Sequence, residues 1–185
     1  MIWSMLGKVV GTAIGLAFLL WWPVWPVRLY VGAFLLGAAP IWLELFATQI
    51  SGVEPSLENR RGWRLADAGI DAFSFLLAPT IWMGGRVLPR LFLFESGRRA
   101  LTLALLVFLV AGLYRFGRFL RDGLAEGEYF DGLPVTYTGY LWAPWVYLAR
   151  WGWVEPAVTV LGFASLAMVW KGLRIRRTHT RHDAS

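Results

Sequence analysis

The chain has 185 residues, of which 57% are hydrophobic and 16% charged, and its formal net charge is +6. This composition is too apolar for one soluble domain, and it is sufficient for several membrane spans of about 20 residues each. Cysteine is absent, which excludes disulfides and thiolate metal sites. The basic residues flank apolar runs, so they indicate contacts with anionic lipid headgroups rather than with nucleic acid.

Apolar runs predict six transmembrane helices, near residues 5–22, 28–50, 66–85, 97–116, 134–150 and 154–173. The first run ends in Trp21-Trp22-Pro23-Val24-Trp25-Pro26, which is typical of a membrane interface, so we expect a retained span rather than a cleaved signal peptide. The sequence therefore predicts an all-α polytopic membrane protein. Its single six-helix transmembrane domain covers residues 1–173, and a basic cytoplasmic tail covers 174–185.

The basic residues are distributed unequally between the two sides of the membrane. Six spans place both termini and the loops at 51–65 and 117–133 on one side, which then carries twelve of the eighteen basic residues. Cytoplasmic segments carry the excess of Lys and Arg in membrane proteins. We therefore expect both termini, and the start of the third span, to face the cytoplasm, in an integral protein of a bacterial inner membrane.

An acidic residue, Glu44, lies within the second predicted span, in Pro40-Ile-Trp-Leu-Glu44-Leu-Phe-Ala-Thr48-Gln49. A mid-span acid avoids lipid and takes a partner inside the bundle. Two interpretations stay open: an oxygen ligand facing the acids of the third span, or a structural acid paired with an arginine. Because a loop of roughly fifteen residues joins the second and third spans, we expect these spans to be neighbours and Glu44 to approach those acids.

Two acids, Asp67 and Asp71, lie four residues apart in the third predicted span. On a helix this spacing puts both carboxylates on one face. A carboxylate in hydrocarbon costs about 3 kcal/mol, so acids there usually mark a site, and two of them suit a hard cation such as Mg²⁺, Ca²⁺ or Mn²⁺. The alternative is stabilisation by a helix N-terminus, worth about 0.3–1 kcal/mol, which suits Asp67 better than Asp71.

Two arginines, Arg115 and Arg118, close the fourth predicted span and are three residues apart, so they share a helix face. One interpretation is that both side chains extend to the membrane interface, as arginine does routinely. The other is an anion clamp, because a guanidinium group binds phosphate or carboxylate through two hydrogen bonds.

Four segments, taken in order, resemble the CDP-alcohol phosphatidyltransferases, and within that family the phosphatidylserine synthase branch. They are Asp67-Ala-Gly-Ile-Asp71-Ala-Phe-Ser74-Phe75-Leu-Leu-Ala78-Pro79, Ala111-Gly-Leu-Tyr-Arg115-Phe-Gly-Arg118-Phe119, Tyr129-Phe130-Asp-Gly132-Leu133-Pro134, and Ala167-Met168-Val169 before the basic tail. The resemblance runs from about residue 62 to 177. The first half of the family's signature is missing, because its early Asp positions fall at Phe46 and Gln49 and its Arg at Glu54.

The resemblance implies a bundle of six transmembrane helices, a homodimer by analogy with that family, and a transferase for substituted phosphate groups. Such an enzyme moves a phosphatidyl group from CDP-diacylglycerol to a small alcohol such as L-serine at the cytoplasmic face, with Mg²⁺ or Mn²⁺. By resemblance, Asp67 and Asp71 would bind metal and Asp71 would be the general base. Arg115 and Arg118 would hold the acceptor's carboxylate or a phosphate, and Glu44 is a candidate further ligand.

The missing early acids favour an alternative function. Two carboxylates in place of four should bind a divalent cation much more weakly. The alternative is a catalytically silent family member, serving as a lipid-binding or structural subunit of a membrane complex. Twelve Trp, six Tyr and twelve Phe suit packing against lipid or a partner. A small transporter is a weaker third hypothesis, because the sequence shows no inverted repeat.

Overall fold

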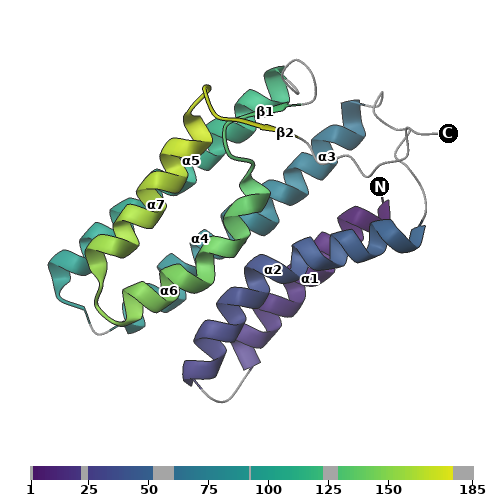
Figure 1. The fold of residues 1–185 in the computed structure, drawn as a ribbon. Helices are drawn as coiled ribbons and strands as arrows, with labels where there is room; N and C mark the ends of the chain where they lie inside the picture. Colours follow the sequence, from purple (N-terminus) through teal and green to yellow (C-terminus); the bar gives the residue numbers. More distant parts are fainter. Residues whose placement is uncertain (1, 22–24, 52–60, 92, 123–128, 177–185) are drawn as a thin grey trace.

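The computed structural model describes residues 2–21, 25–51, 61–91, 93–122 and 129–176, and it is a bundle of helices closed at one end by a short sheet (Figure 1). The first half of the chain contains α1 (Ile2–Trp21), α2 (Trp25–Ser51), α3 (Arg61–Asp71), η1 (Ala72–Leu77), α4 (Ala78–Trp82), η2 (Met83–Val87) and η3 (Leu88–Arg90). The second half contains α5 (Glu95–Asp122), β1 (Tyr129–Asp131), η4 (Val135–Leu141), α6 (Trp142–Arg150), α7 (Val154–Val169) and β2 (Arg174–Arg176).

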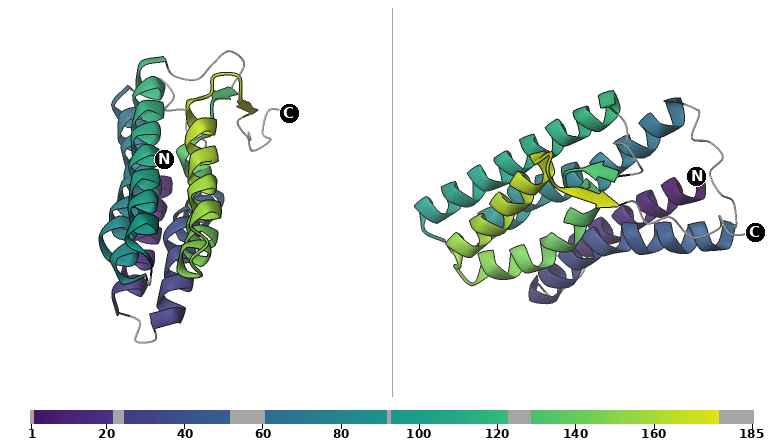
Figure 2. Two further views of the ribbon diagram at one scale, coloured as in Figure 1. Left: turned by 90° about the vertical axis from the view of Figure 1, so that its left-hand side faces the viewer. Right: turned by 45° about the horizontal axis from the view of Figure 1, so that its top comes forward.

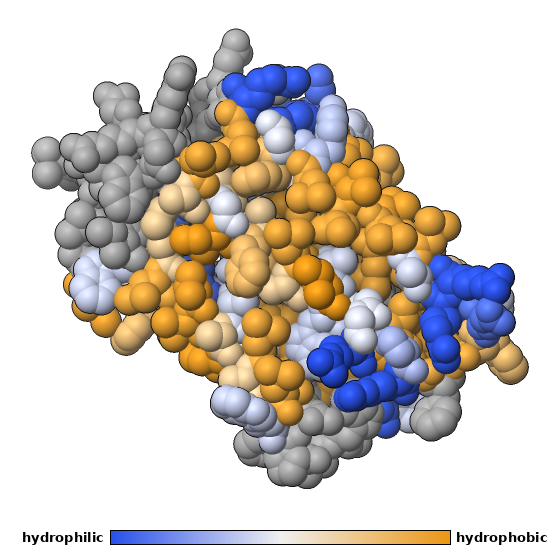
Figure 3. All heavy atoms as spheres, turned by 180° about the vertical axis from the view of Figure 1, so that it is seen from behind, coloured by the Kyte–Doolittle hydropathy of each residue, from blue (hydrophilic) through white to orange (hydrophobic). Residues whose placement is uncertain are grey.

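Four helical stretches in the described part of the chain are long and apolar enough to cross a membrane: Trp3–Trp21, Leu29–Ala47, Leu65–Arg90 and Glu95–Arg121. Many large apolar side chains on them face outward, and they cover much of the face seen in Figure 3. An outward apolar surface is what a bilayer requires. The chain is therefore an all-α membrane protein, as the sequence predicts.

The last two predicted spans correspond to shorter elements. The span predicted at 134–150 is η4 followed by α6, and the span at 154–173 is α7, an apolar helix of 16 residues. The structure thus shows four long spans, and a membrane crossing by the last two elements stays a prediction. Parts of four predicted regions lie outside the described residues: 52–60 and 123–128 of the two predicted loops, 22–24 of the aromatic cluster and 177–185 of the tail.

The third span continues past a proline because its hydrogen bonding changes register. Pro79 has no backbone N–H to donate and its ring clashes with an α-helical neighbour. In η1 the register widens to that of a π-helix, and the Ala78 N–H bonds to the Phe73 carbonyl, five residues back. The helix axis continues through η1, so Asp67 and Asp71 precede a widened turn rather than a break.

The α1–α2 hairpin packs through a row of glycines on α1. A Cβ atom at Gly7, Gly11 or Gly15 would lie 2.4 to 2.6 Å from backbone atoms of α2. Small residues four apart allow two helix backbones to approach closely in a membrane. Lys8 follows Gly7 directly, so this close approach sets the position of Lys8 against α2. The same kind of contact joins Gly37 of α2 to Gly139 of η4.

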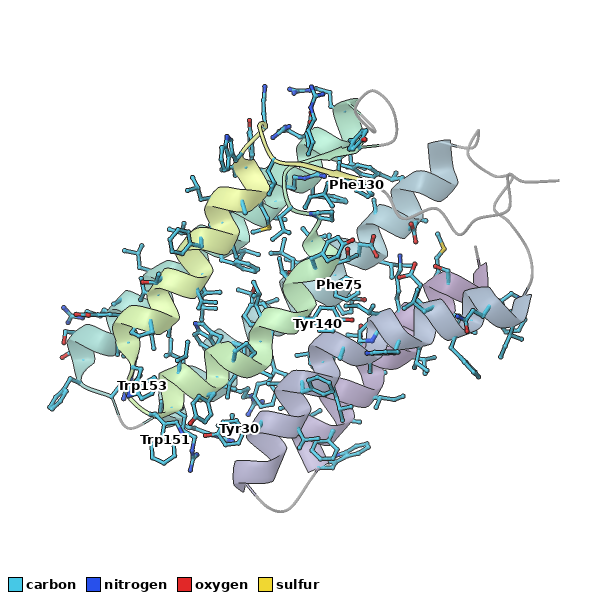
Figure 4. The ribbon with its side chains drawn as sticks, in the orientation of Figure 1. Tyr30, Phe75, Phe130, Tyr140, Trp151 and Trp153 are labelled. Carbon is cyan, nitrogen blue, oxygen red and sulfur yellow. The ribbon has the colours of Figure 1, made fainter. Side chains whose placement is uncertain are left out.

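Aromatic residues fill the core between α5, η4 and α6. Trp142 and Trp145 are fully buried, and the Trp142 ring packs edge-on against Phe108 at 5.3 Å between centroids. Other aromatic residues gather at the end of the bundle where α6 turns into α7. There Tyr30, Trp151 and Trp153 lie around Tyr147 (Figure 4), which is typical of a membrane interface.

The opposite end of the bundle carries the two-stranded sheet. Strands β1 and β2 pair antiparallel, with Asp131 opposite Arg174. Figures 1 and 2 show the sheet at the same end as the start of α1, the end of α2, the start of α3 and the end of α5. Glycine is required after β1, because Gly132 has a φ of 83°. This end brings together most of the residues that the sequence singles out.

Candidate functional site

Lys8 of α1 lies at the centre of three carboxylates. Its ammonium nitrogen is 3.1 Å from Glu44 Oε1, 2.8 Å from Asp67 Oδ1 and 2.6 Å from Asp71 Oδ1. The Lys8 side chain is only 2% exposed. Helices α1, α2 and α3 each contribute at least one member. We call Lys8, Glu44, Asp67 and Asp71 the acid–lysine cluster.

Two hydroxyl groups on α1 support this cluster. Ser4 Oγ donates to Glu44 Oε1 at 2.8 Å, and Thr12 Oγ1 donates to the Lys8 carbonyl at 2.9 Å. Lys8 also donates a hydrogen bond to Asp67. The 2.6 Å contact with Asp71 Oδ1 is an ion pair rather than a hydrogen bond. One positive and three negative charges leave the cluster with a formal excess of two negative charges.

The structure brings together the three acids that the sequence singled out. Asp67 and Asp71 share a face, and Glu44 lies with them on the interior side of α2. The partner that joins all three is a lysine rather than an arginine. By contrast, Phe46 and Gln49, which stand at the early Asp positions of the family signature, are both exposed.

The sequence does not identify Lys8 as a site residue, because in it Lys8 is only a basic residue near the start of the first span. Two signals point to it. Lys8 lies within an apolar run, where an ionisable residue usually has a function and a partner. It also lies between Gly7 and Gly11, whose spacing of four predicts a close helix–helix contact on that side of α1.

The cluster fits the chain's own ammonium better than it fits a divalent cation. Mg²⁺, Mn²⁺ and Ca²⁺ bind oxygen ligands at about 2.0–2.6 Å. A metal ion that shared Asp67 and Asp71 with Lys8 would stand next to a positive charge already within 3.1 Å of all three carboxylates. In the described ranges, this cluster included, no group of three or more His, Cys, Asp or Glu is placed to hold a metal ion.

A second charged group consists of Arg115 and Arg118 near the end of α5. Their side chains are 6% and 7% exposed. Neither guanidinium group therefore lies in water, as it would if the side chains simply extended to the membrane interface. Arg118 Nη1 donates to the Val169 carbonyl at 3.2 Å, and Arg118 Nη2 lies 3.9 Å from Asp131 Oδ2. The Arg115 guanidinium lies 6.0 Å from the centre of the Phe119 ring.

The arginine pair has more positive charge and more hydrogen-bond donors than its partners among the described residues satisfy. Two guanidinium groups face one carboxylate, Asp131, which leaves a formal charge of +1. The Nε atoms of Arg115 and Arg118 are buried and have no hydrogen-bond partner among the described residues. A buried donor without a partner is costly, and arginine donors suit the oxygens of an anion. The pair is therefore a candidate phosphate or carboxylate site.

The two charged groups lie at the same end of the bundle but on different elements. The acid–lysine cluster lies between α1, α2 and α3, whereas the arginine pair faces β1 and the end of α7. Within the described residues, the ion pair of Arg118 runs to Asp131 rather than to Asp67 or Asp71. From the shared helix face within each pair we expect Asp67, Asp71, Arg115 and Arg118 to line one cytoplasmic cavity, and this stays a prediction.

Comparisons with protein-family models, with curated proteins and with solved structures found no match to this chain.

Proposed function

We propose that this protein binds a phosphate-bearing lipid headgroup at the cytoplasmic end of its bundle, without catalysing phosphatidyl transfer. In this proposal it is a catalytically silent relative of the CDP-alcohol phosphatidyltransferases. The observation that supports the proposal best is the buried Arg115–Arg118 pair, whose Nε donors have no partner among the described residues.

The position of the arginine pair favours a lipid over a free anion. Arg115 and Arg118 lie in the last two turns of Glu95–Arg121, a stretch able to span a membrane, so they stand at headgroup depth. The helix exposes Val107, Val110 and Leu113 below them, which suits contact with acyl chains. A lipid such as CDP-diacylglycerol or phosphatidic acid supplies both parts: its diphosphate or phosphate is the anion, and its acyl chains contact the helix.

The ion pairs of the acid–lysine cluster argue against catalysis of phosphatidyl transfer. Phosphoryl transfer needs cations that neutralise developing charge and a base that takes a proton. Asp71, the base implied by the family resemblance, is held by the Lys8 ammonium at 2.6 Å, and so is Asp67 at 2.8 Å. Both carboxylates are thereby engaged in an internal ion pair.

The second candidate is the phosphatidyltransferase itself, moving a phosphatidyl group from CDP-diacylglycerol to a small alcohol such as L-serine with Mg²⁺ or Mn²⁺. One observation favours it: the side chains of Asp67 and Asp71 are 37% and 21% exposed. An acceptor hydroxyl group can therefore approach them from outside the cluster. The catalytic role of Asp71 and the metal role of Asp67 belong to this second candidate.

We also propose that η4 with α6, and α7, complete a six-crossing topology with both termini in the cytoplasm. Residues 135–150 and the 16 residues of α7 each extend along the bundle beside the long spans (Figure 2). A helix of 16 residues is about 24 Å long, slightly less than the hydrocarbon core of about 30 Å. Trp151 and Trp153 would then mark the outer interface. A homodimer, or a place in a larger membrane complex, is part of the same proposal.

The test is lipid binding by purified protein in nanodiscs that contain CDP-diacylglycerol or phosphatidic acid. We expect both Arg115→Gln and Arg118→Gln to weaken binding about tenfold or more, because each removes charged donors from a buried site. Arg99→Gln is the matched control, since Arg99 is 78% exposed at the other end of α5. Equal binding by all variants would contradict the arginine site.

The same preparation separates the two candidates. With Mn²⁺, CDP-diacylglycerol and serine, the silent protein releases no CMP. Release of CMP that Asp71→Asn abolishes would instead establish the transferase, because an amide neither accepts the proton nor carries the charge that a metal requires.

A further inference from the structure

We infer that the Lys8 ammonium is a built-in replacement for a divalent cation, so that the acid–lysine cluster is filled and held together without metal. The inference concerns α1, which lies outside the part of the chain that resembles the phosphatidyltransferases. It goes beyond the proposed lipid site, because it assigns a role to Lys8, Glu44, Asp67 and Asp71 whether or not Arg115 and Arg118 bind a headgroup.

The contacts of Lys8 match what an ammonium group can make. A lysine ammonium can face three partners, and here it donates a hydrogen bond to Asp67 and forms ion pairs with Glu44 and Asp71. Two of the three nitrogen–oxygen distances, 2.8 and 2.6 Å, are short, as expected where donor and acceptor are both ionised. Lys8 therefore connects its acids as a metal ion connects its ligands.

The position of the ammonium is determined by the helix packing. Gly7 and Gly11 flank Lys8, and a Cβ at either would collide with the backbone of α2 at Leu43 or Pro40. This contact keeps the Lys8 backbone close to the part of α2 that carries Glu44. With its side chain only 2% exposed, Lys8 carries a charge that is stable there only because the three acids surround it.

Removal of the ammonium would change the charge of the cluster. Glu44, Asp67 and Asp71 would be left with three negative charges and oxygen ligands from two helices, the donor set that hard divalent cations prefer. Three carboxylates that repel each other in a largely buried site have a strong reason to bind such a cation. Loss of Lys8 should therefore create a divalent-cation site that the natural chain does not have.

The experiment measures Mn²⁺ binding to the full-length protein in detergent, by loss of the electron paramagnetic resonance signal of free Mn²⁺. We expect no specific binding by the unchanged protein at about 1 mM Mn²⁺, and binding by Lys8→Met with a Kd on the order of 10⁻⁴ M. Lys171→Met is the matched control, because Lys8 and Lys171 are the two lysines of the chain and Lys171 is exposed. It should behave as the unchanged protein does.

Two results would overturn the inference. The first is Mn²⁺ binding by the unchanged protein that Asp67→Asn abolishes, and the second is a folded Lys8→Met protein that binds no Mn²⁺. If Lys8→Met does not fold alone, Lys8→Met with Asp71→Asn keeps three oxygen-donating side chains with less repulsion and takes its place. If neither variant folds, the measurement on the unchanged protein decides. These readouts involve no lipid, so they are independent of the proposed function.

Discussion

Lys8 joins three helices through its ion pairs. Its ammonium lies within 3.1 Å of carboxylates from α2 and α3, while its own backbone belongs to α1. The acids without Lys8 carry three like charges, whereas Lys8 without one acid still has two partners. The members of the acid–lysine cluster are therefore unequal in their effect on stability.

This inequality gives a prediction for two substitutions. Lys8→Met should lower the free energy of unfolding by about 1–3 kcal/mol in metal-free buffer, because it leaves three partly buried carboxylates without a counter-charge. Asp71→Asn should cost less than Lys8→Met, because it reduces the negative excess from two charges to one. Thermal unfolding of the purified protein in one detergent, with chelator present, measures both. An Asp71→Asn protein less stable than Lys8→Met would show that Lys8 is not the centre of the cluster.

The grouping of the acids could be predicted from sequence, but their partner could not. A spacing of four places Asp67 and Asp71 on one helix face, and a mid-span acid such as Glu44 must turn inward. Lys8 lies 36 residues before Glu44 in the sequence. Its contact with three acids depends on how closely α1 approaches α2, which is a property of the packed hairpin rather than of any local motif.

The α1–α2 hairpin is the element that places Lys8. Gly7, Gly11 and Gly15 form one row along α1, and each meets the backbone of α2. In a membrane there is little hydrophobic force between helices, so close packing of small residues is a main source of their association. The row of glycines therefore links helix packing to the formation of the acid–lysine cluster.

This packing leads to a prediction that compares two identical substitutions. Gly11→Ala should destabilise the protein by about 1–3 kcal/mol, because the new Cβ would lie 2.4 Å from Pro40 N and force the helices apart. Gly162→Ala on α7 meets nothing within 4 Å and should be neutral or stabilising by up to about 1 kcal/mol. Thermal unfolding in detergent compares them. Equal effects at the two positions would contradict the close approach of α1 and α2.

The observed helices match the predicted spans where apolar runs are long, and they differ from the predicted spans near proline and glycine. The predicted spans at 5–22, 28–50, 66–85 and 97–116 match Trp3–Trp21, Leu29–Ala47, Leu65–Arg90 and Glu95–Arg121. The region after Pro134 instead begins as the 3₁₀-helix η4 before α6 starts at Trp142. Its close backbone contact with Gly37 favours that tighter form, and no sequence period reveals such a contact.

At the scale of the whole molecule, the two ends of the bundle differ in chemistry. One end holds the acid–lysine cluster, the arginine pair and the β1–β2 sheet, and the other holds the aromatic group around Tyr147. The outward apolar surface lies between them (Figure 3). In the proposed orientation this charged end lies in the cytoplasm, where basic residues concentrate in membrane proteins.

The orientation can be tested with single cysteines, because the natural chain has none. We expect Arg174→Cys in β2 to react with a membrane-impermeant maleimide only after the cells are opened. Ser96→Cys at the start of α5 should react in cells whose outer membrane has been made permeable while the inner membrane stays intact. Both residues are exposed, so access to the reagent depends on the side of the membrane. The opposite pattern would place the lipid site on the outer face.

The most direct measurement of the central claim is an experimental structure of the unchanged protein prepared with Mn²⁺, with anomalous scattering recorded at the manganese edge. We expect no manganese peak in the acid–lysine cluster, and we expect the Lys8 ammonium within hydrogen-bonding distance of Glu44, Asp67 and Asp71, at 2.6–3.1 Å. A manganese peak between Asp67 and Asp71, with the Lys8 side chain displaced from all three acids, would contradict it.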